Sequence, residues 1–346
     1  MHYFLPLANS FLHSKLYIEG YDNLNELVVN QSRSYVVYPP MPAVLLVPFA
    51  LFFGVEISQV YPTIIFASLA GAFFFLFLLK LTKAKNAVIL SALLLFGTNF
   101  FMTSLIGRSW YFAHICAVLF LAIALYFAES KKPVLAGLFY VFAGLSRLPV
   151  LLAFPALLFL LKPKIKDIYK FFTPVVVLLI LYAEYNFIRF GSFTQTGYSL
   201  IPGVLDEPWF KEGIFSVSYI LRNLEAIFLY FPKFINQFPF VSISPIGLAL
   251  WIVTPALLLL VFVWKNRLSR VMILTSLLVL LPSLLHGSVG FSQFGYRFSL
   301  DAILLLITAL IPIVETKPRL AYVLIAISVL INFYVVILYH LGYFQP

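Results

Sequence analysis

A succession of long apolar runs separated by short basic turns constrains this chain more than any other feature of its sequence. About 20 apolar residues in a helix span the hydrocarbon core of a bilayer. With 62% hydrophobic residues, 10% charged residues and a mean hydropathy of +1.01, the chain is predicted to be an all-α polytopic membrane protein. The runs lie at about 57–80, 86–106, 110–128, 133–161, 170–189, 246–264, 270–286, 297–314 and 320–340.

The charge of each turn predicts its side of the membrane. Fourteen of the 23 basic residues fall in short turns between the apolar runs, and short cytoplasmic turns are enriched in Lys and Arg. This placement also accounts for the formal charge of +10, so no nucleic-acid partner is implied. The run 133–161 has basic turns at both ends. We therefore expect it to form a hairpin of two short helices that turns at residues 146–149.

The whole chain, residues 1–346, is predicted to be one integral-membrane domain of the plasma membrane. Alternation of the turns gives about ten membrane segments, with the N-terminus and the active site outside. Because the chain begins outside without a signal peptide, we expect a further helix upstream of residue 1. The expected parts are an outer loop with interfacial helices (1–56), helices 1–6 (57–189), a long outer loop (190–245) and helices 7–10 (246–346).

Four arginines stand at the outer ends of predicted segments, and this clustering is the first indication of a site. They are Arg108, Arg147, Arg189 and Arg297. The planar guanidinium fork matches phosphate oxygens. A ring of these groups would hold a phosphate or pyrophosphate headgroup while its lipid tail lies between helices. The alternative is that each arginine anchors a helix end among the lipid headgroups.

The stretch HGSVGFSQFGYRFSLD, residues 286–301, places polar groups between two apolar runs. An ionisable residue at such a position marks a candidate functional site. If the run is α-helical, Arg297 and Asp301 share one face. They either pair only with each other, or Arg297 contacts a ligand and Asp301 orients it. Gln293 and Tyr296 are further candidates for sugar or phosphate contacts.

Several other side chains have two interpretations. His114 lies near the outer end of its helix, where it either bonds a neighbour or serves as a ligand. Tyr198 and Trp209 either stack on a sugar or anchor the long loop at the interface. The isolated His2 and the lone Cys116 give no metal-site pattern, so no metal site is predicted.

Strings along nearly the whole chain resemble one membrane-enzyme superfamily. They are YPPMPAVLLVPFALFFG, GTNFFMTSLIGRSWYFAH, GLSRLP and QFGYRFSLD. The chain resembles the GT-C integral-membrane glycosyltransferases, and within them the dolichyl-phosphate-mannose protein mannosyltransferase branch. This resemblance implies an inverting transfer of a sugar from a polyprenyl-phosphate donor to a glycan, lipid or protein acceptor at the outer face. The sequence requires no cofactor, and it leaves open whether the reaction uses a divalent metal ion.

The resemblance also suggests site residues. In such enzymes an acid of the first outer loop acts as general base. Glu26 matches an acid that relatives place ahead of the YPPMP string beginning at Tyr38, and Asp22 is the second candidate. Relatives carry an acid in an earlier string, where this chain has Asn9. They carry another acid in the second outer loop, where this chain has Arg108 and His114.

Two other function classes remain open from the sequence. A lipid or polysaccharide transporter also uses ionisable residues within a membrane, but transporters usually contain internal repeats, and none is recognisable here. A catalytically inactive membrane protein of the same fold is favoured by the departures at Asn9 and Arg108.

Overall fold

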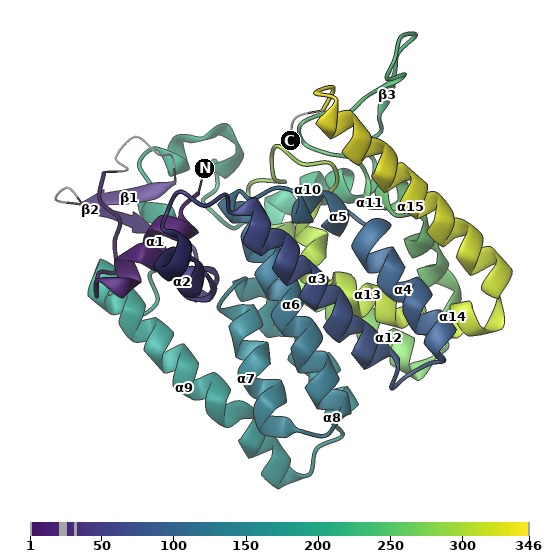
Figure 1. The fold of residues 1–346 in the computed structure, drawn as a ribbon, viewed down its shortest axis with the longest axis horizontal. Helices are drawn as coiled ribbons and strands as arrows, with labels where there is room; N and C mark the ends of the chain where they lie inside the picture. Colours follow the sequence, from purple (N-terminus) through teal and green to yellow (C-terminus); the bar gives the residue numbers. More distant parts are fainter. Residues whose placement is uncertain (1, 21–25, 31–32, 345–346) are drawn as a thin grey trace.

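The chain folds into a bundle of apolar helices, described by a computed structural model for residues 2–20, 26–30 and 33–344 (Figure 1). Five helices are long and apolar enough to cross a membrane. They are α3 (Val60–Leu78), α6 (Ser109–Glu129), α9 (Ile165–Phe190), α12 (Arg267–Leu285) and α15 (Pro318–His340). The protein is therefore an all-α polytopic membrane protein, as the apolar runs predict.

Three of the expected apolar segments are not continuous helices. The run 86–106 divides at residues 97–99 into α4 (Ala84–Phe96) and α5 (Phe100–Ser104). The run 246–264 consists of α11 (Leu250–Val253) and the 3₁₀ helix η6 (Pro255–Phe262), because Pro255 has no N–H for a continuing α-helix. The run 297–314 contains the 3₁₀ helix η7 (Arg297–Asp301), then α13 (Ile303–Ala309) and α14 (Ile311–Thr316).

The expected hairpin in the run 133–161 is confirmed. It consists of α7 (Pro133–Gly144), then a turn and the 3₁₀ helix η1 (Leu148–Ala153), and finally α8 (Phe154–Leu161). The Tyr140 hydroxyl donates to the Leu151 carbonyl near the turn, and Lys131 donates to the Leu160 carbonyl at the open end. Arg147 lies in the turn between the two arms, with an extended backbone.

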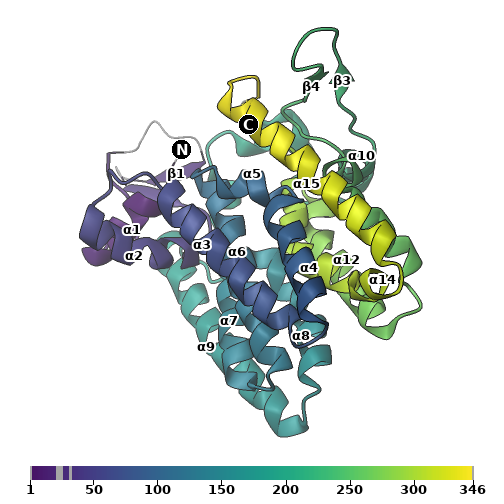
Figure 2. The same cartoon turned by 45° about the vertical axis from the view of Figure 1, so that its right-hand side comes forward.

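Helix α6 lies at the centre of the bundle and is buried almost throughout its length. It packs against α3, α7 and α8, whereas α9 and α15 lie at opposite edges of the molecule (Figures 1 and 2). Helices α7 and α9 approach closely because residue 137 is glycine. A Cβ atom there would lie 1.9 Å from the Phe171 carbonyl oxygen. The core of the fold is therefore built around α6, whose N-terminal end carries several residues of the candidate site.

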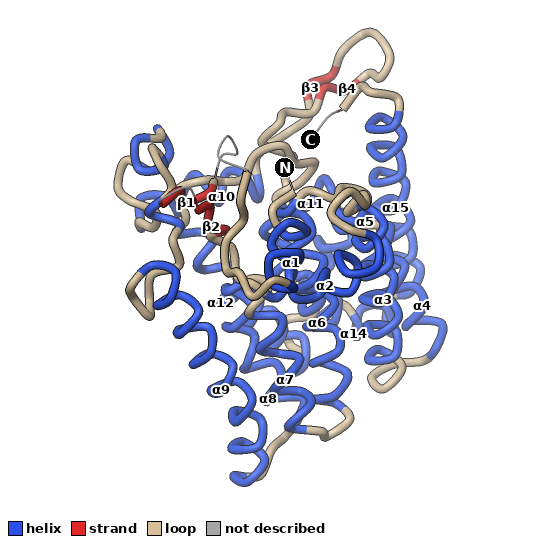
Figure 3. The backbone as a smooth tube through the Cα atoms, turned by 60° about the vertical axis from the view of Figure 1, so that its left-hand side comes forward, coloured by secondary structure: helices blue, strands red, loops and turns tan. Residues whose placement is uncertain are grey.

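Irregular segments gather at the end of the bundle where α6 begins (Figure 3). The N-terminal part contains α1 (Phe4–Leu12), the antiparallel pair β1 (Leu27–Asn30) and β2 (Arg33–Val36), and α2 (Met41–Phe53). The long connection after α9 contains short 3₁₀ helices η2 (Tyr198–Leu200), η3 (Val204–Asp206), η4 (Pro208–Phe210) and η5 (Val217–Tyr219), then α10 (Ile220–Phe228) and a projecting hairpin of β3 (Lys233–Phe234) and β4 (Val241–Ser242).

Candidate functional site

Glu26 is held by two aromatic side chains from distant parts of the chain. The Tyr38 hydroxyl donates to Glu26 Oε2 at 2.5 Å, and the indole Nε1 of Trp110 donates to the same oxygen at 2.5 Å. The same indole N–H lies 2.8 Å from the Tyr38 hydroxyl. Trp110 is in the first turn of α6, so these bonds attach the β1 segment to the central helix.

The backbone of Glu26 adopts an unusual conformation. Its φ angle is 69°, in the left-handed region that a residue with a Cβ atom rarely occupies. Such strain persists where surrounding contacts impose it, and it is frequent at functional sites. Burial raises the pKa of the Glu26 carboxyl above its ordinary value, whereas the bonds from Tyr38 and Trp110 and the nearby charge of Arg297 lower it. The two hydrogen bonds therefore fix the position of the carboxyl, and its surroundings set its pKa.

Arg297 lies beside this carboxyl, surrounded by aromatic rings. Its guanidinium carbon is 5.5 Å from the centre of the Trp110 ring, 5.8 Å from that of Tyr111 and 5.3 Å from that of Phe298. A guanidinium in such a position is attracted to the ring faces. One Nη1 proton is donated to the Phe291 carbonyl at 2.8 Å. Trp110 therefore contacts both the carboxylate and the arginine of the site.

Arg147 approaches the same place from the tip of the α7–α8 hairpin. Its guanidinium carbon is 5.4 Å from the centre of the Phe298 ring, which Arg297 also contacts. Nε and Nη2 of Arg147 donate to Asp301 Oδ1 and Oδ2 at 3.2 and 2.9 Å. His114 Nδ1 lies 2.9 Å from Asp301 Oδ1. The structure thus brings together Glu26, Arg147 and Arg297 through shared aromatic neighbours.

Of the two alternatives for Arg297 and Asp301, the one in which they pair only with each other is wrong, because Asp301 pairs with Arg147. Arg297 and Asp301 belong to the 3₁₀ helix η7 and not to an α-helix. With about three residues per turn, positions four apart point in different directions. Asp301 is buried and bonds to Arg147 and His114, so it does not orient Arg297 either.

Arg189 has a different environment from the other predicted arginines. Its Nη1 donates to the Val36 carbonyl at 2.6 Å, its Nη2 to Asn186 Oδ1 at 2.8 Å and its Nε to the Tyr185 carbonyl at 3.2 Å. The guanidinium is buried against the Tyr185 ring. Arg189 therefore joins α9 to the end of β2, with each nitrogen engaged by a protein oxygen, and the structure does not support its predicted place in a phosphate-binding ring.

Other predicted residues have mainly structural contacts. Gln293 is buried, and its amide bonds to the Ile246 and Val289 carbonyls and to the Arg297 backbone N–H. The buried Tyr296 hydroxyl lies 3.0 Å from Asn223 Oδ1. Arg108 immediately precedes α6, where its carbonyl accepts from the first turn of that helix. Asp22 lies outside the described residues.

The connection that follows α9 packs onto this site through His286. The imidazole makes edge contacts with the rings of Tyr198, Phe210, Phe215 and Phe298. Burial, with smaller effects of the Arg147 and Arg297 charges, lowers the pKa of His286 to about 4, so the ring is neutral at pH 7. Burial raises the pKa of Tyr198, and the charge of Glu26 adds to this effect.

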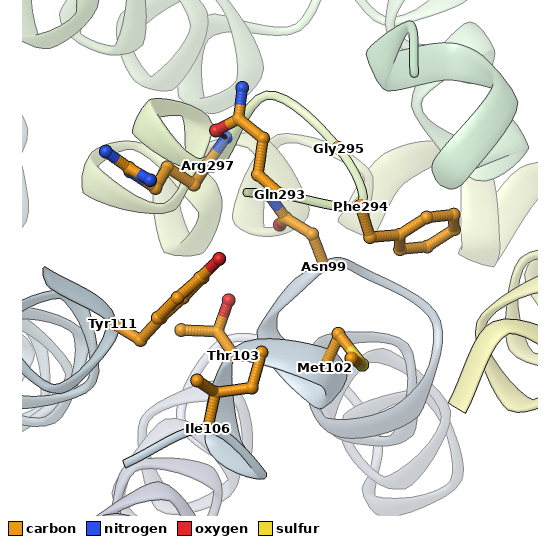
Figure 4. Close-up of a pocket in the computed structure, with 9 residues that line it drawn as sticks. All are labelled: Asn99, Met102, Thr103, Ile106, Tyr111, Gln293, Phe294, Gly295 and Arg297. Atoms are coloured by element: carbon orange, nitrogen blue, oxygen red, sulfur yellow. Dashed lines mark hydrogen bonds between the residues drawn. The ribbon is translucent and has the colours of Figure 1, made fainter. Parts of the chain in front are cut away.

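A small pocket lies beside Arg297, between the start of α6, α5 and the segment before η7 (Figure 4). In Figure 4 the Tyr111 ring and Thr103 face the side of the pocket that Gln293 and Arg297 form. The cavity volume is about 10 Å³, which is close to the room that one water molecule needs. A sugar therefore enters this region only if neighbouring side chains or loops move.

Sequence reasoning missed Trp110, Phe298 and His286 as parts of the site. Trp110 follows the predicted Arg108 by two positions, and the other two lie within the quoted 286–301 stretch. Aromatic residues are so frequent in this chain that no single one stands out. Among the residues that the structure describes, no group of three or more His, Cys, Asp or Glu side chains is arranged to hold a metal ion.

Comparisons with known proteins give little direct guidance. No family model and no curated protein matches this chain. One solved structure, the apo form of the Archaeoglobus fulgidus oligosaccharyltransferase, is similar with a TM-score of 0.45 and 14% sequence identity. The similarity covers 96% of this chain, which spans about half (50%) of the length of the archaeal protein.

Proposed function

We propose that this protein is a membrane glycosyltransferase that moves a sugar from a polyprenyl-phosphate carrier to an acceptor hydroxyl at the outer face of the plasma membrane. The observation that carries the proposal is the juxtaposition of Glu26 with two guanidinium groups, those of Arg147 and Arg297, through Trp110 and Phe298. A carboxylate base and two phosphate-binding cations are the groups that such a transfer needs.

The reaction follows from these groups. The Glu26 carboxylate removes the proton of the acceptor hydroxyl as that oxygen attacks the anomeric carbon of the donor sugar. The bond between this carbon and the phosphate oxygen breaks, and the electron pair leaves with the lipid phosphate. Arg147 and Arg297 bind the phosphate and stabilise its added charge. Glu26 ends the step protonated and returns its proton to water.

An apolar groove offers a place for the lipid tail. It has a volume of about 390 Å³ and lies between α3 and α4, lined by Gly71, Phe75, Val88, Leu95 and Phe96 among others. Phe96 contacts Phe101 of α5, the helix that also lines the pocket beside Arg297. A tail in this groove would place the attached phosphate toward the arginines. The small pocket, which α5, the start of α6 and residues 293–297 line, has to widen when the donor binds.

The test is a transfer assay with purified protein in proteoliposomes that contain a radiolabelled polyprenyl-phosphate sugar and candidate acceptors. The proposal predicts label in the acceptor and release of polyprenyl phosphate. Movement of the labelled lipid between leaflets without transfer would instead identify a transporter. Absence of both activities, in protein that is folded and binds no polyprenyl phosphate, would contradict the proposal and favour a non-catalytic role.

A further inference from the structure

Asp301 is the most completely enclosed charged group at this site. Its side chain is 0% exposed and lies against three donors, namely Arg147 Nε, Arg147 Nη2 and His114 Nδ1. The donors come from two segments, the hairpin tip and α6, and Asp301 itself belongs to a third, η7. Burying a carboxylate is costly unless it is paired and hydrogen-bonded. The three contacts provide that compensation.

The pairing leaves part of the Arg147 guanidinium available. Guanidinium has five N–H donors in a fixed plane. The carboxylate takes the edge formed by Nε and Nη2, so the two protons of Nη1 and the second proton of Nη2 point away from Asp301. The Arg147 side chain is 20% exposed although its partner is fully enclosed. The outward edge is the part of the guanidinium that the pair with Asp301 leaves for a ligand.

The hydrogen bonds of Arg147 differ from those of Arg189, whose contacts are purely structural. Each nitrogen of Arg189 is engaged by a protein oxygen, and the whole residue is only 6% exposed. Arg147 instead bonds to the protein along one edge, and its plane rests on the Phe298 ring beside Arg297. Fixing one edge of a guanidinium lowers the entropy that is lost when the other edge binds an anion.

We infer that Asp301 is a positioning residue, which fixes Arg147 so that its free edge binds an oxygen of the lipid phosphate, while His114 fixes Asp301. This inference rests on the proposed function, because it assigns the phosphate of that donor to Arg147. Among the residues that the structure describes, no carboxylate pairs with the Arg297 guanidinium, which donates to the Phe291 carbonyl and rests on aromatic rings. Arg147 is therefore the fixed member of the pair and Arg297 the adaptable one.

The experiment measures binding of polyprenyl phosphate, which carries no sugar, and of uncharged polyprenol to purified protein in nanodiscs. Wild type is expected to prefer the phosphate. Asp301→Asn, which keeps the shape but loses the charge, is expected to weaken phosphate binding about tenfold, the loss of roughly one charge-assisted hydrogen bond, with polyprenol binding unchanged. A folded Asp301→Asn protein with wild-type affinity for the phosphate would overturn the inference.

Control variants separate positioning from general destabilisation. Asn332→Leu on α15 removes buried bonds to the Val253 carbonyl of α11 and the Ser328 carbonyl of α15, so it should lower the melting temperature without changing phosphate affinity. If Asp301→Asn does not fold, Arg147→Lys keeps the charge but loses the two-bond edge, and the same tenfold loss is expected. An unchanged affinity in that variant also overturns the inference.

Different results would contradict the proposed function and the inference about Asp301. Wild type that prefers polyprenyl phosphate to polyprenol but transfers no sugar would contradict the proposed reaction, while the affinity of Asp301→Asn still decides the role of Asp301. Wild type that does not distinguish the two lipids would overturn the inference itself, because no phosphate would then be bound at Arg147.

Discussion

The guanidinium of Arg189 donates to the carbonyl oxygen of Val36 at 2.6 Å, across a sequence separation of 153 residues. This bond links α9 to the strand that leads toward Tyr38. Replacing Arg189 with Ala leaves the Val36 carbonyl without this donor in a buried place, so we expect a loss of roughly 1–3 kcal/mol in the free energy of unfolding. Polyprenyl-phosphate affinity should stay within about twofold.

Thermal unfolding and lipid binding on the same Arg189→Ala sample check this prediction. A tenfold loss of phosphate affinity with unchanged stability would show that Arg189 binds the ligand after all.

Tyr38→Phe tests how the acidity of Glu26 is set. The Tyr38 hydroxyl stabilises the charged carboxylate and so opposes the effect of burial on the Glu26 pKa. Because a general base acts in its ionised form, activity should rise with pH through this raised pKa. Removing the hydroxyl should raise the pKa further and move the rise to higher pH. A pH profile of kcat/KM measures the shift, and an unmoved profile would exclude this role for Tyr38.

His286 should make stability depend on pH. Its pKa is lowered to about 4 in the folded protein, from an ordinary value of 6.5. The unfolded chain therefore binds the proton first, and stability is lost as pH falls from about 6.5 to about 4, by on the order of 3 kcal/mol from this group. Denaturation of wild type and His286→Phe at pH 7 and pH 5 should show a smaller decrease in the variant. Equal decreases would contradict the assignment.

Gly137→Ala tests the close contact of α7 with α9. Alanine favours a helix by about 1 kcal/mol over glycine, but the added Cβ would lie 1.9 Å from the Phe171 carbonyl oxygen. We expect the clash to dominate, with a net destabilisation of roughly 1–3 kcal/mol. Val134→Ala, at a position 50% exposed on the same helix, is the control and should change stability little. A stabilised Gly137→Ala protein would show that the helices separate without cost.

The sequence predicts much of the helical framework because apolar runs of membrane length are a strong signal. Helices α6 and α15 follow their runs closely, and the turn at Arg147 was expected from basic residues at both ends of one run. The breaks in the runs around Gly97 and Pro255 are not predicted, since a hydropathy pattern shows neither a turn between two apolar α-helices nor the difference between α and 3₁₀ helix.

Site geometry is less accessible from sequence. Arg147 and Arg189 both stand at segment ends, and only the fold shows that one keeps a free edge while the other is engaged by Val36, Asn186 and Tyr185. The partners of Asp301 lie 154 and 187 residues away. No local spacing rule predicts such pairs. The string resemblance predicts a role for Glu26, whereas only the fold shows its bonds to Tyr38 and Trp110.

The most direct test of the account is sugar transfer by Glu26→Gln, measured beside Glu19→Gln. Both changes remove one carboxylate charge from the N-terminal part, but Glu19 is exposed and pairs with Lys15 at the surface. With Glu26 as the base, Glu26→Gln should lower kcat about 10²- to 10⁴-fold while polyprenyl-phosphate binding persists, and Glu19→Gln should retain wild-type transfer. A folded Glu26→Gln protein that transfers sugar at the wild-type rate would contradict the account.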